Sequence, residues 1–235
     1  MIPIKDQHSF SSISTFNFCP IKYDFIYNKG MKISNPILER GSKIHENIES
    51  FIKNGIFEEI DSFDSTYVKN YITELQEKYP KEKYDWFIEK EFWLNKNFRP
   101  ITEKNGFIHG FVDLIIVSKN FYLNPEIIVI DWKSGQYKIR EKQDWKQLFL
   151  YSQYALYNFS LYNVSNLEMN YVYVDSGKVN SLNFKPDNHW FIENSLKNWI
   201  STWFEKTITF DKNNFQPQEE PCQFCDFNDQ CKYFQ

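Results

Sequence analysis

The 235-residue sequence predicts an α/β protein whose central mixed β-sheet is flanked by helices. Two observations predict this class. Apolar residues recur at helical spacing through most of the first eighty residues, and three strand-like apolar runs then follow at 86–94, 107–117 and 126–133. A helical pattern at 140–159, a predicted hairpin at 167–184 and a helical pattern at 190–206 complete the order.

Helix start and stop signals divide the N-terminal part into four predicted helices. Serines can cap a short helix at 11–18, and Cys19-Pro20 then predicts a break and a restart over 20–30, because proline fits the first position of a helix. Two longer helices are predicted at 35–55 and 64–79, which Gly55 and Pro80 end. We expect a single domain over 1–235, with a helical part at 9–80, a core at 84–185 and a C-terminal helix with a cysteine segment at 187–235.

Composition and charge narrow the class of protein. Hydrophobic residues make up 42% and aromatic residues 19%, which is typical of a globular chain. The net charge of −4 argues against a basic protein that coats nucleic acid, although it allows a locally basic groove. The start of the chain shows no apolar run of the signal-peptide type, and no run of 18 apolar residues occurs. We therefore expect a soluble, cytoplasmic protein.

The four cysteines are unevenly placed. Cys222, Cys225 and Cys231 lie within ten residues near the C-terminus, and Cys19 is the fourth. In a reducing compartment, clustered cysteines hold a metal more often than they form disulfides. Their spacing alone does not distinguish Zn²⁺ from an iron–sulfur cluster, and buried unligated cysteines would not explain three in ten residues.

Two aspartates stand in strands that are apolar on both faces. Asp113 and Asp131 lie nine residues on either side of Tyr122, in a turn-rich stretch, so a hairpin centred there would place their Cβ atoms about 4.5–5.5 Å apart. Two such carboxylates repel each other and lose hydration, and a divalent cation offsets both costs. An isolated aspartate would more simply face water or cap a turn. The pair in register, with Lys133 on the same face, favours a metal site.

Three further polar residues have plain structural interpretations on their own. His45 aligns with Ile48 and Ile52 on a helix, where a lone histidine is more often a hydrogen-bonded core residue than a ligand. Gln147 and Tyr151 are four residues apart and therefore project from one helix face.

In chain order, "GSKIHENIE", "GFVDLIIV", "VIDWKSGQ" and "QLFLY" resemble the RecB-like branch of the PD-(D/E)XK nucleases, which has a helical His, then Gly-x-x-Asp, Asp-x-Lys and Gln-x-x-x-Tyr. The early Cys-Pro and the terminal C-x2-C-x5-C resemble the iron–sulfur subset of that branch. The stand-alone CRISPR-associated RecB-like exonucleases and the AddB-type nuclease domains belong to this subset. Asp131 stands where the wider superfamily more often has Glu, which the RecB-like branch permits.

The resemblance implies two sets of ligands. His45, Asp113, Asp131 and the backbone carbonyl of Trp132 would hold Mg²⁺ or Mn²⁺. Lys133 would orient the attacking water or stabilise developing charge, while Gln147 and Tyr151 would position the nucleic-acid strand. The implied ligands of a 4Fe–4S cluster are Cys19, Cys222, Cys225 and Cys231.

The activity implied is that of a Mg²⁺- or Mn²⁺-dependent deoxyribonuclease, an exonuclease on single-stranded DNA or DNA ends. The implied pathway is CRISPR spacer acquisition or phage-type recombination, and the implied partners are a CRISPR integrase or recombination proteins. No association with a membrane is expected. A phage-encoded chain would act in the host cytoplasm. No G-x4-G-K-[ST] motif occurs, so no helicase motor is expected. The alternatives are a catalytically idle DNA-binding or assembly subunit and a zinc-stapled RNA-binding protein.

Overall fold

The computed structural model describes residues 4–32, 36–102, 106–120, 125–159, 164–185, 189–211, 215, 222, 225–231 and 233. The chain forms two compact units. The larger unit spans residues 35–196, and the smaller unit joins residues 1–34 to residues 197–235. The smaller unit therefore combines the N-terminal helices with the cysteine-bearing C-terminal segment.

The larger unit is built on a five-stranded sheet, as the sequence predicted. The strands are β1 (Tyr84–Leu94), β2 (Ile108–Ser118), β3 (Glu126–Lys133), β4 (Asn166–Tyr173) and β5 (Lys178–Phe184), and they lie in this order across the sheet. All neighbours are antiparallel except β3 and β4, which are parallel and are connected through α5 (Lys146–Asn158). A helical crossover is the usual way to join parallel neighbours, and it makes this sheet mixed.

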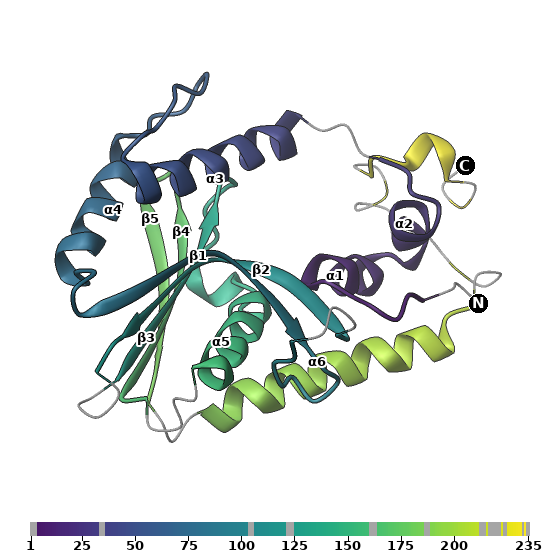
Figure 1. Ribbon diagram of the computed structural model, residues 1–235. Coiled ribbons are helices and arrows are strands. Elements are labelled where there is room, and N and C mark those ends of the chain that lie inside the picture. The colour runs from purple at the N-terminus through teal and green to yellow at the C-terminus, as the bar shows by residue number, and fades with distance from the viewer. Residues whose placement is uncertain are drawn as a thin grey trace. The chain divides into compact units, whose positions relative to one another are not determined.

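Helices cover both faces of the sheet. Figure 1 shows α3 (Pro36–Asn54) and α4 (Thr66–Lys78) on one face and α5 on the other. Buried aliphatic residues of α3 and α4 pack against the sheet through Leu114, Ile116, Ile128, Ile130 and Trp132. Because β2 and β3 are covered on both faces, β2 from Val112 onward and the middle of β3 are buried and mostly apolar, and an acidic residue among them is a costly exception.

Two predicted helices differ from the structure. The helix predicted at 140–159 begins only at Lys146, after a single 3-10 turn at Arg140–Lys142. The carboxylate of Asp144 accepts a hydrogen bond from the backbone N–H of Lys146 at 3.0 Å, and such a local bond competes with helix formation. The helix predicted at 20–30 is α2 (Pro20–Tyr23) followed by a π-helical turn at Asp24–Asn28.

The smaller unit contains α1 (Phe10–Phe18), α2 and the later part of α6 (His189–Thr209). The predicted break at Cys19 is present, and this residue serves both helices. Its backbone N–H donates to the Thr15 carbonyl, and its Sγ accepts from the backbone N–H of Lys22 at 3.4 Å. Among the described residues, no helix is long and apolar enough to cross a membrane.

Gly110, the glycine of the Gly-x-x-Asp motif, makes room for an aromatic ring. A Cβ at Gly110 would lie 2.9 Å from Cε1 of Phe92, and the Phe92 ring packs against Tyr151 and Tyr154 at centroid distances of 5.7 and 5.3 Å. The glycine thus lets β1 contact α5 close to the tyrosine of Gln-x-x-x-Tyr.

The Gly110→Ala variant should lower the free energy of unfolding by about 1–3 kcal/mol, because the buried Phe92 ring has to shift. Gly135→Ala is the matched control, since a Cβ at Gly135 meets nothing within 4 Å, and its effect should stay within about 1 kcal/mol. Urea unfolding of both variants measures the difference, and equal stabilities would contradict the role given to Gly110.

Candidate metal centre

The pairing of β2 with β3 places the two aspartates opposite each other. Leu114 pairs with Ile130, and the register continues in the other direction to Val117 and Ile127. The ladder ends at Leu114 and Ile130, and the same register continued by one residue places Asp113 opposite Asp131. The predicted register is therefore confirmed, although its expected centre, Tyr122, lies outside the described residues.

Asp113 connects the sheet to α3. Its Oδ2 accepts a hydrogen bond from the backbone N–H of Trp132 at 2.8 Å and lies 3.5 Å from Nδ1 of His45. The helix comes close at this point because Gly41 has no Cβ, and a Cβ there would lie 2.9 Å from Oγ of Ser134. His45 follows Gly41 by one helical turn, so the close approach of Gly41 to Ser134 also brings the His45 side chain near the aspartates.

Asp131 begins a chain of contacts that joins the Asp-x-Lys and Gln-x-x-x-Tyr motifs. Its Oδ2 lies 2.6 Å from Nζ of Lys133, and the same ammonium donates to Oε1 of Gln147 at 2.9 Å. The Gln147 amide donates in turn to the Tyr151 hydroxyl at 2.7 Å. Asp131 is only 2% exposed, and its Oδ2 accepts no hydrogen bond of good geometry. The ion pair with Lys133 therefore compensates this buried carboxylate.

The structure adds Glu89, which the sequence analysis did not identify. Glu89 stands opposite Asp113 between two ladder pairs of β1 and β2, and its φ of 48° is rare for a residue with a side chain. The ligand atoms of His45, Glu89 and Asp113 all lie within 4.8 Å of one another. The sequence signal available was a glutamate in the middle of the apolar run at 86–94. Backbone strain of this kind tends to occur at functional sites.

The site binds protons strongly because its acidic groups are crowded and partly buried. Burial and the neighbouring Asp113 raise the pKa of Glu89 to about 7, and burial also raises the pKa of Asp131, against the opposing ammonium of Lys133. Burial lowers the pKa of His45, but the carboxylates outweigh it, with Asp113 first among them, and raise that pKa to about 9. A cation at this position would take the place of these protons.

The donor set fits a hard divalent cation. The group whose ligand atoms lie together is His45, Glu89 and Asp113, and its two carboxylates and imidazole suit Mn²⁺ or a partly hydrated Mg²⁺. Asp131, predicted as a further ligand, lies outside this group and contacts Lys133 instead. Trp132 contributes its backbone N–H to Asp113, while its indole is buried on the opposite side of the strand against Tyr71. The carbonyl of Trp132 as a ligand stays a prediction.

The four predicted cysteine ligands come together in the smaller unit. Cys19, Cys222, Cys225 and Cys231 line one small cavity, whose other walls include Ile21, Phe25 and Phe227. The thiols are free, and burial raises the pKa of Cys19. Lys22 and Asp226 form an ion pair at 2.9 Å that connects α2 to the C-terminal segment beside the thiols. Four thiols in one enclosed cavity fit a metal or cluster that cysteinates would bind.

Comparison with known proteins agrees with this chemistry. The family model of the PD-(D/E)XK nuclease superfamily matches residues 7–232, which is nearly the whole chain. None of the curated proteins matches. Among solved structures, the crystal structure of SSO0001 has 13% sequence identity and a TM-score of 0.42, over 100% of this chain and 90% of that one. A likeness of this degree bears on neither activity nor substrate.

Mg²⁺ or Mn²⁺ should raise the melting temperature, because an ion that binds only the native state stabilises it by mass action. At an ion concentration 100-fold above Kd, we expect a rise of about 5–10 °C, which thermal unfolding by circular dichroism measures. Asp113→Asn should keep the hydrogen bond from Trp132, melt at or above the wild-type temperature without the ion, and lose the rise. Glu89→Gln should reduce the rise in melting temperature that the ion causes.

Asp85→Asn is the control for both variants, since Asp85 is an exposed carboxylate of the same sheet that pairs with Lys119. Its rise should equal that of the wild type. An equal rise in wild type and Asp113→Asn would contradict a metal site shared by the two aspartates.

Proposed function

We propose, because the chain belongs to the PD-(D/E)XK nuclease superfamily, that it hydrolyses phosphodiester bonds of DNA at the centre formed by His45, Asp113 and Asp131. The observation that carries the proposal is the position of Lys133. Its ammonium lies between the buried carboxylate of Asp131 and the amide of Gln147, beside the acidic cluster. A partly exposed lysine held in this way is suited to a phosphate oxygen or an attacking water.

Each residue of the centre has a role that its contacts support. Asp113, Asp131 and His45, with the carbonyl of Trp132, would hold Mg²⁺ or Mn²⁺, and Glu89 would join them. The ion, when bound, supplies a water of lowered pKa and offsets charge on the scissile phosphate. Lys133 stabilises negative charge on the reacting oxygens. Gln147 orients Lys133 through the 2.9 Å hydrogen bond and is itself oriented by Tyr151, which packs on Phe92.

We further propose that the chain belongs to the RecB-like branch and acts as an exonuclease on single-stranded DNA or DNA ends. The ordered motifs around His45, Asp113, Lys133 and Tyr151 support this assignment. CRISPR spacer acquisition or phage-type recombination is the proposed setting, with an integrase or recombination proteins as partners.

A catalytically idle DNA-binding subunit is the second candidate. In an inactive subunit, we would expect the metal-binding residues and the catalytic lysine to be replaced by other residues. Instead, Asp113, Asp131 and Lys133 are all present and in contact with suitable partners, which favours an active enzyme.

Asp131→Ala or Lys133→Ala should reduce cleavage of labelled single-stranded DNA in Mn²⁺ by at least about 100-fold, the cost typical of losing one group that stabilises transition-state charge. EDTA should abolish cleavage by the wild type. Lys119→Ala, at an exposed ion pair with Asp85, is the control and should cleave normally. Full activity of either site variant would rule out the assigned centre, and parallel reactions on duplex DNA and RNA would establish the substrate class.

We propose a 4Fe–4S cluster at the four-thiol cavity, which ties Cys19 to the C-terminal segment. Such a tie closes a loop of about 200 residues, and by the chain-entropy model it would contribute about 5 kcal/mol. Its ligands are separate from those of the hydrolytic centre, so its role is structural.

Cys19→Ala and Cys225→Ala should therefore bleach the brown colour expected near 400 nm and lower the melting temperature, while Ser11→Ala, an exposed position of α1, should change neither. Cleavage per folded molecule should persist in the cysteine variants. A colourless protein that contains one zinc ion per chain would contradict the iron–sulfur assignment and favour zinc. A Cys19→Ala variant as stable as the wild type would show that the cross-link between Cys19 and the C-terminal cysteines does not stabilise the fold.

A further inference from the structure

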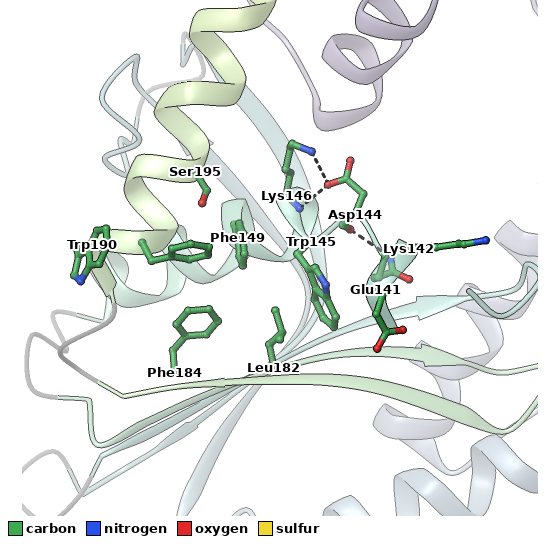
Figure 2. Close-up of a pocket in the computed structure, with 12 residues that line it drawn as sticks. Glu141, Lys142, Asp144, Trp145, Lys146, Phe149, Leu182, Phe184, Trp190 and Ser195 are labelled. Carbon is green, nitrogen blue, oxygen red and sulfur yellow. Dashed lines mark hydrogen bonds and ion pairs between the residues drawn. The ribbon is translucent and has the colours of Figure 1, made fainter. Parts of the chain in front are cut away.

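An aromatic pocket with a volume of about 810 Å³ lies beside the start of α5 in the larger unit. Its lining residues come from the segment before α5, from α5 itself, from β5 and from the start of α6. Figure 2 shows Trp145, Phe149, Phe184 and Leu182 around the same space, with Trp190 at its edge. The volume is within the range of roughly 300–1,000 Å³ that is usual for pockets that bind small organic groups.

Two of the aromatic rings of this pocket are exposed to solvent. Trp190 is 63% exposed and Phe191 is 45% exposed, although both are large apolar side chains. The Phe191 ring stacks on Phe184 at 6.0 Å and meets Phe149 edge-on at the same distance. Exposed apolar rings grouped around a cavity are typical of a binding surface.

The charged groups of the pocket lie at its rim. Lys146 pairs with Asp144 at 3.0 Å, and Figure 2 shows the Lys142 side chain pointing away from the aromatic rings. Glu141 and Asp144 balance the two lysines among the lining residues, so net charge alone does not make the pocket attractive to an anion. A ligand that places a flat apolar group inside and an anionic group at the lysines fits this distribution.

The pocket lies close to the proposed catalytic centre, with the Tyr171 ring between them. Trp145 and Lys146 line the pocket, and the next residue, Gln147, hydrogen bonds to Lys133. The Trp145 ring contacts the Tyr171 ring at 5.4 Å, and Nζ of Lys133 lies 5.0 Å from the centroid of that same ring. One buried tyrosine therefore separates the pocket wall from the lysine proposed to act on the phosphate.

We propose that this pocket binds an unpaired nucleobase of the nucleic-acid strand that is cleaved, and so gives the enzyme its preference for unpaired strands. The inference rests on the proposed nuclease function. A base inside a duplex is paired and stacked, whereas an unpaired base can enter the pocket and stack on Trp190, Phe191 or Trp145. Its phosphates then remain outside, near Lys146 and Lys142, and the strand extends from there to Lys133.

Binding in EDTA tests this inference apart from cleavage. Fluorescence anisotropy would compare an unpaired 20-nucleotide strand with the same strand in which a central run of nucleotides is abasic. Trp190→Ala should weaken binding of the normal strand by at least about 5-fold, since one base–aromatic stack is worth about 1–3 kcal/mol, and should leave binding of the abasic strand unchanged. Trp190→Phe keeps a ring and should restore most of the affinity.

Phe204→Ala is the matched control, because Phe204 is an exposed aromatic residue of the same helix, is 39% exposed and does not line the pocket. It should bind both strands as the wild type does. Equal affinities of wild type and Trp190→Ala for the normal strand would overturn the base pocket and leave the cleavage results standing. Binding of an aromatic-rich peptide that is lost in Trp190→Ala, without any effect of this variant on the oligonucleotide, would also overturn it and assign the pocket to a protein partner.

Discussion

The larger unit depends on the burial of like charges in a place that is otherwise apolar. Asp113 and Asp131 lie at the end of the β2–β3 ladder, and Glu89 stands on the other side of Asp113. Each carboxylate loses hydration and repels its neighbours, so the arrangement is unfavourable without compensation. His45, Lys133 and the backbone N–H of Trp132 provide it in part. Three elements meet at this point because each contributes to this compensation. Helix α3 carries His45, the end of β3 carries Lys133, and α5 carries Gln147, which hydrogen bonds to Lys133.

The sequence predicted those parts of this centre whose geometry depends on residues close together in the chain. The equal separation of Asp113 and Asp131 from a turn-rich stretch specified their pairing, because an antiparallel hairpin leaves little freedom of register once its turn is placed. The helical spacing of Gln147 and Tyr151 was equally direct, and their hydrogen bond follows from it. The mixed sheet and its flanking helices followed from the order of patterns along the chain.

Other features could not be predicted because they depend on distant partners or on backbone strain. Glu89 reaches the centre through the pairing of β1 with β2 and through a left-handed backbone conformation, and no sequence periodicity indicates either. The start of α5 was misplaced because the Asp144 side chain competes with the helix, a local choice that apolar spacing does not report. The division into two units, with α6 continuing from one into the other, also has no marker such as a glycine- or proline-rich linker.

The position of Cys19 has a consequence for the order of events during synthesis. The residue is held between α1 and α2 by bonds to Thr15 and Lys22, which need only the first helices of the chain. The other three thiols are translated about 200 residues later, which takes roughly 10–40 s at usual ribosomal rates. During that interval Cys19 is a single thiol without its partners. The four-thiol cavity can therefore form only after Cys231 has been translated, so the Cys19 thiol must stay reduced until then.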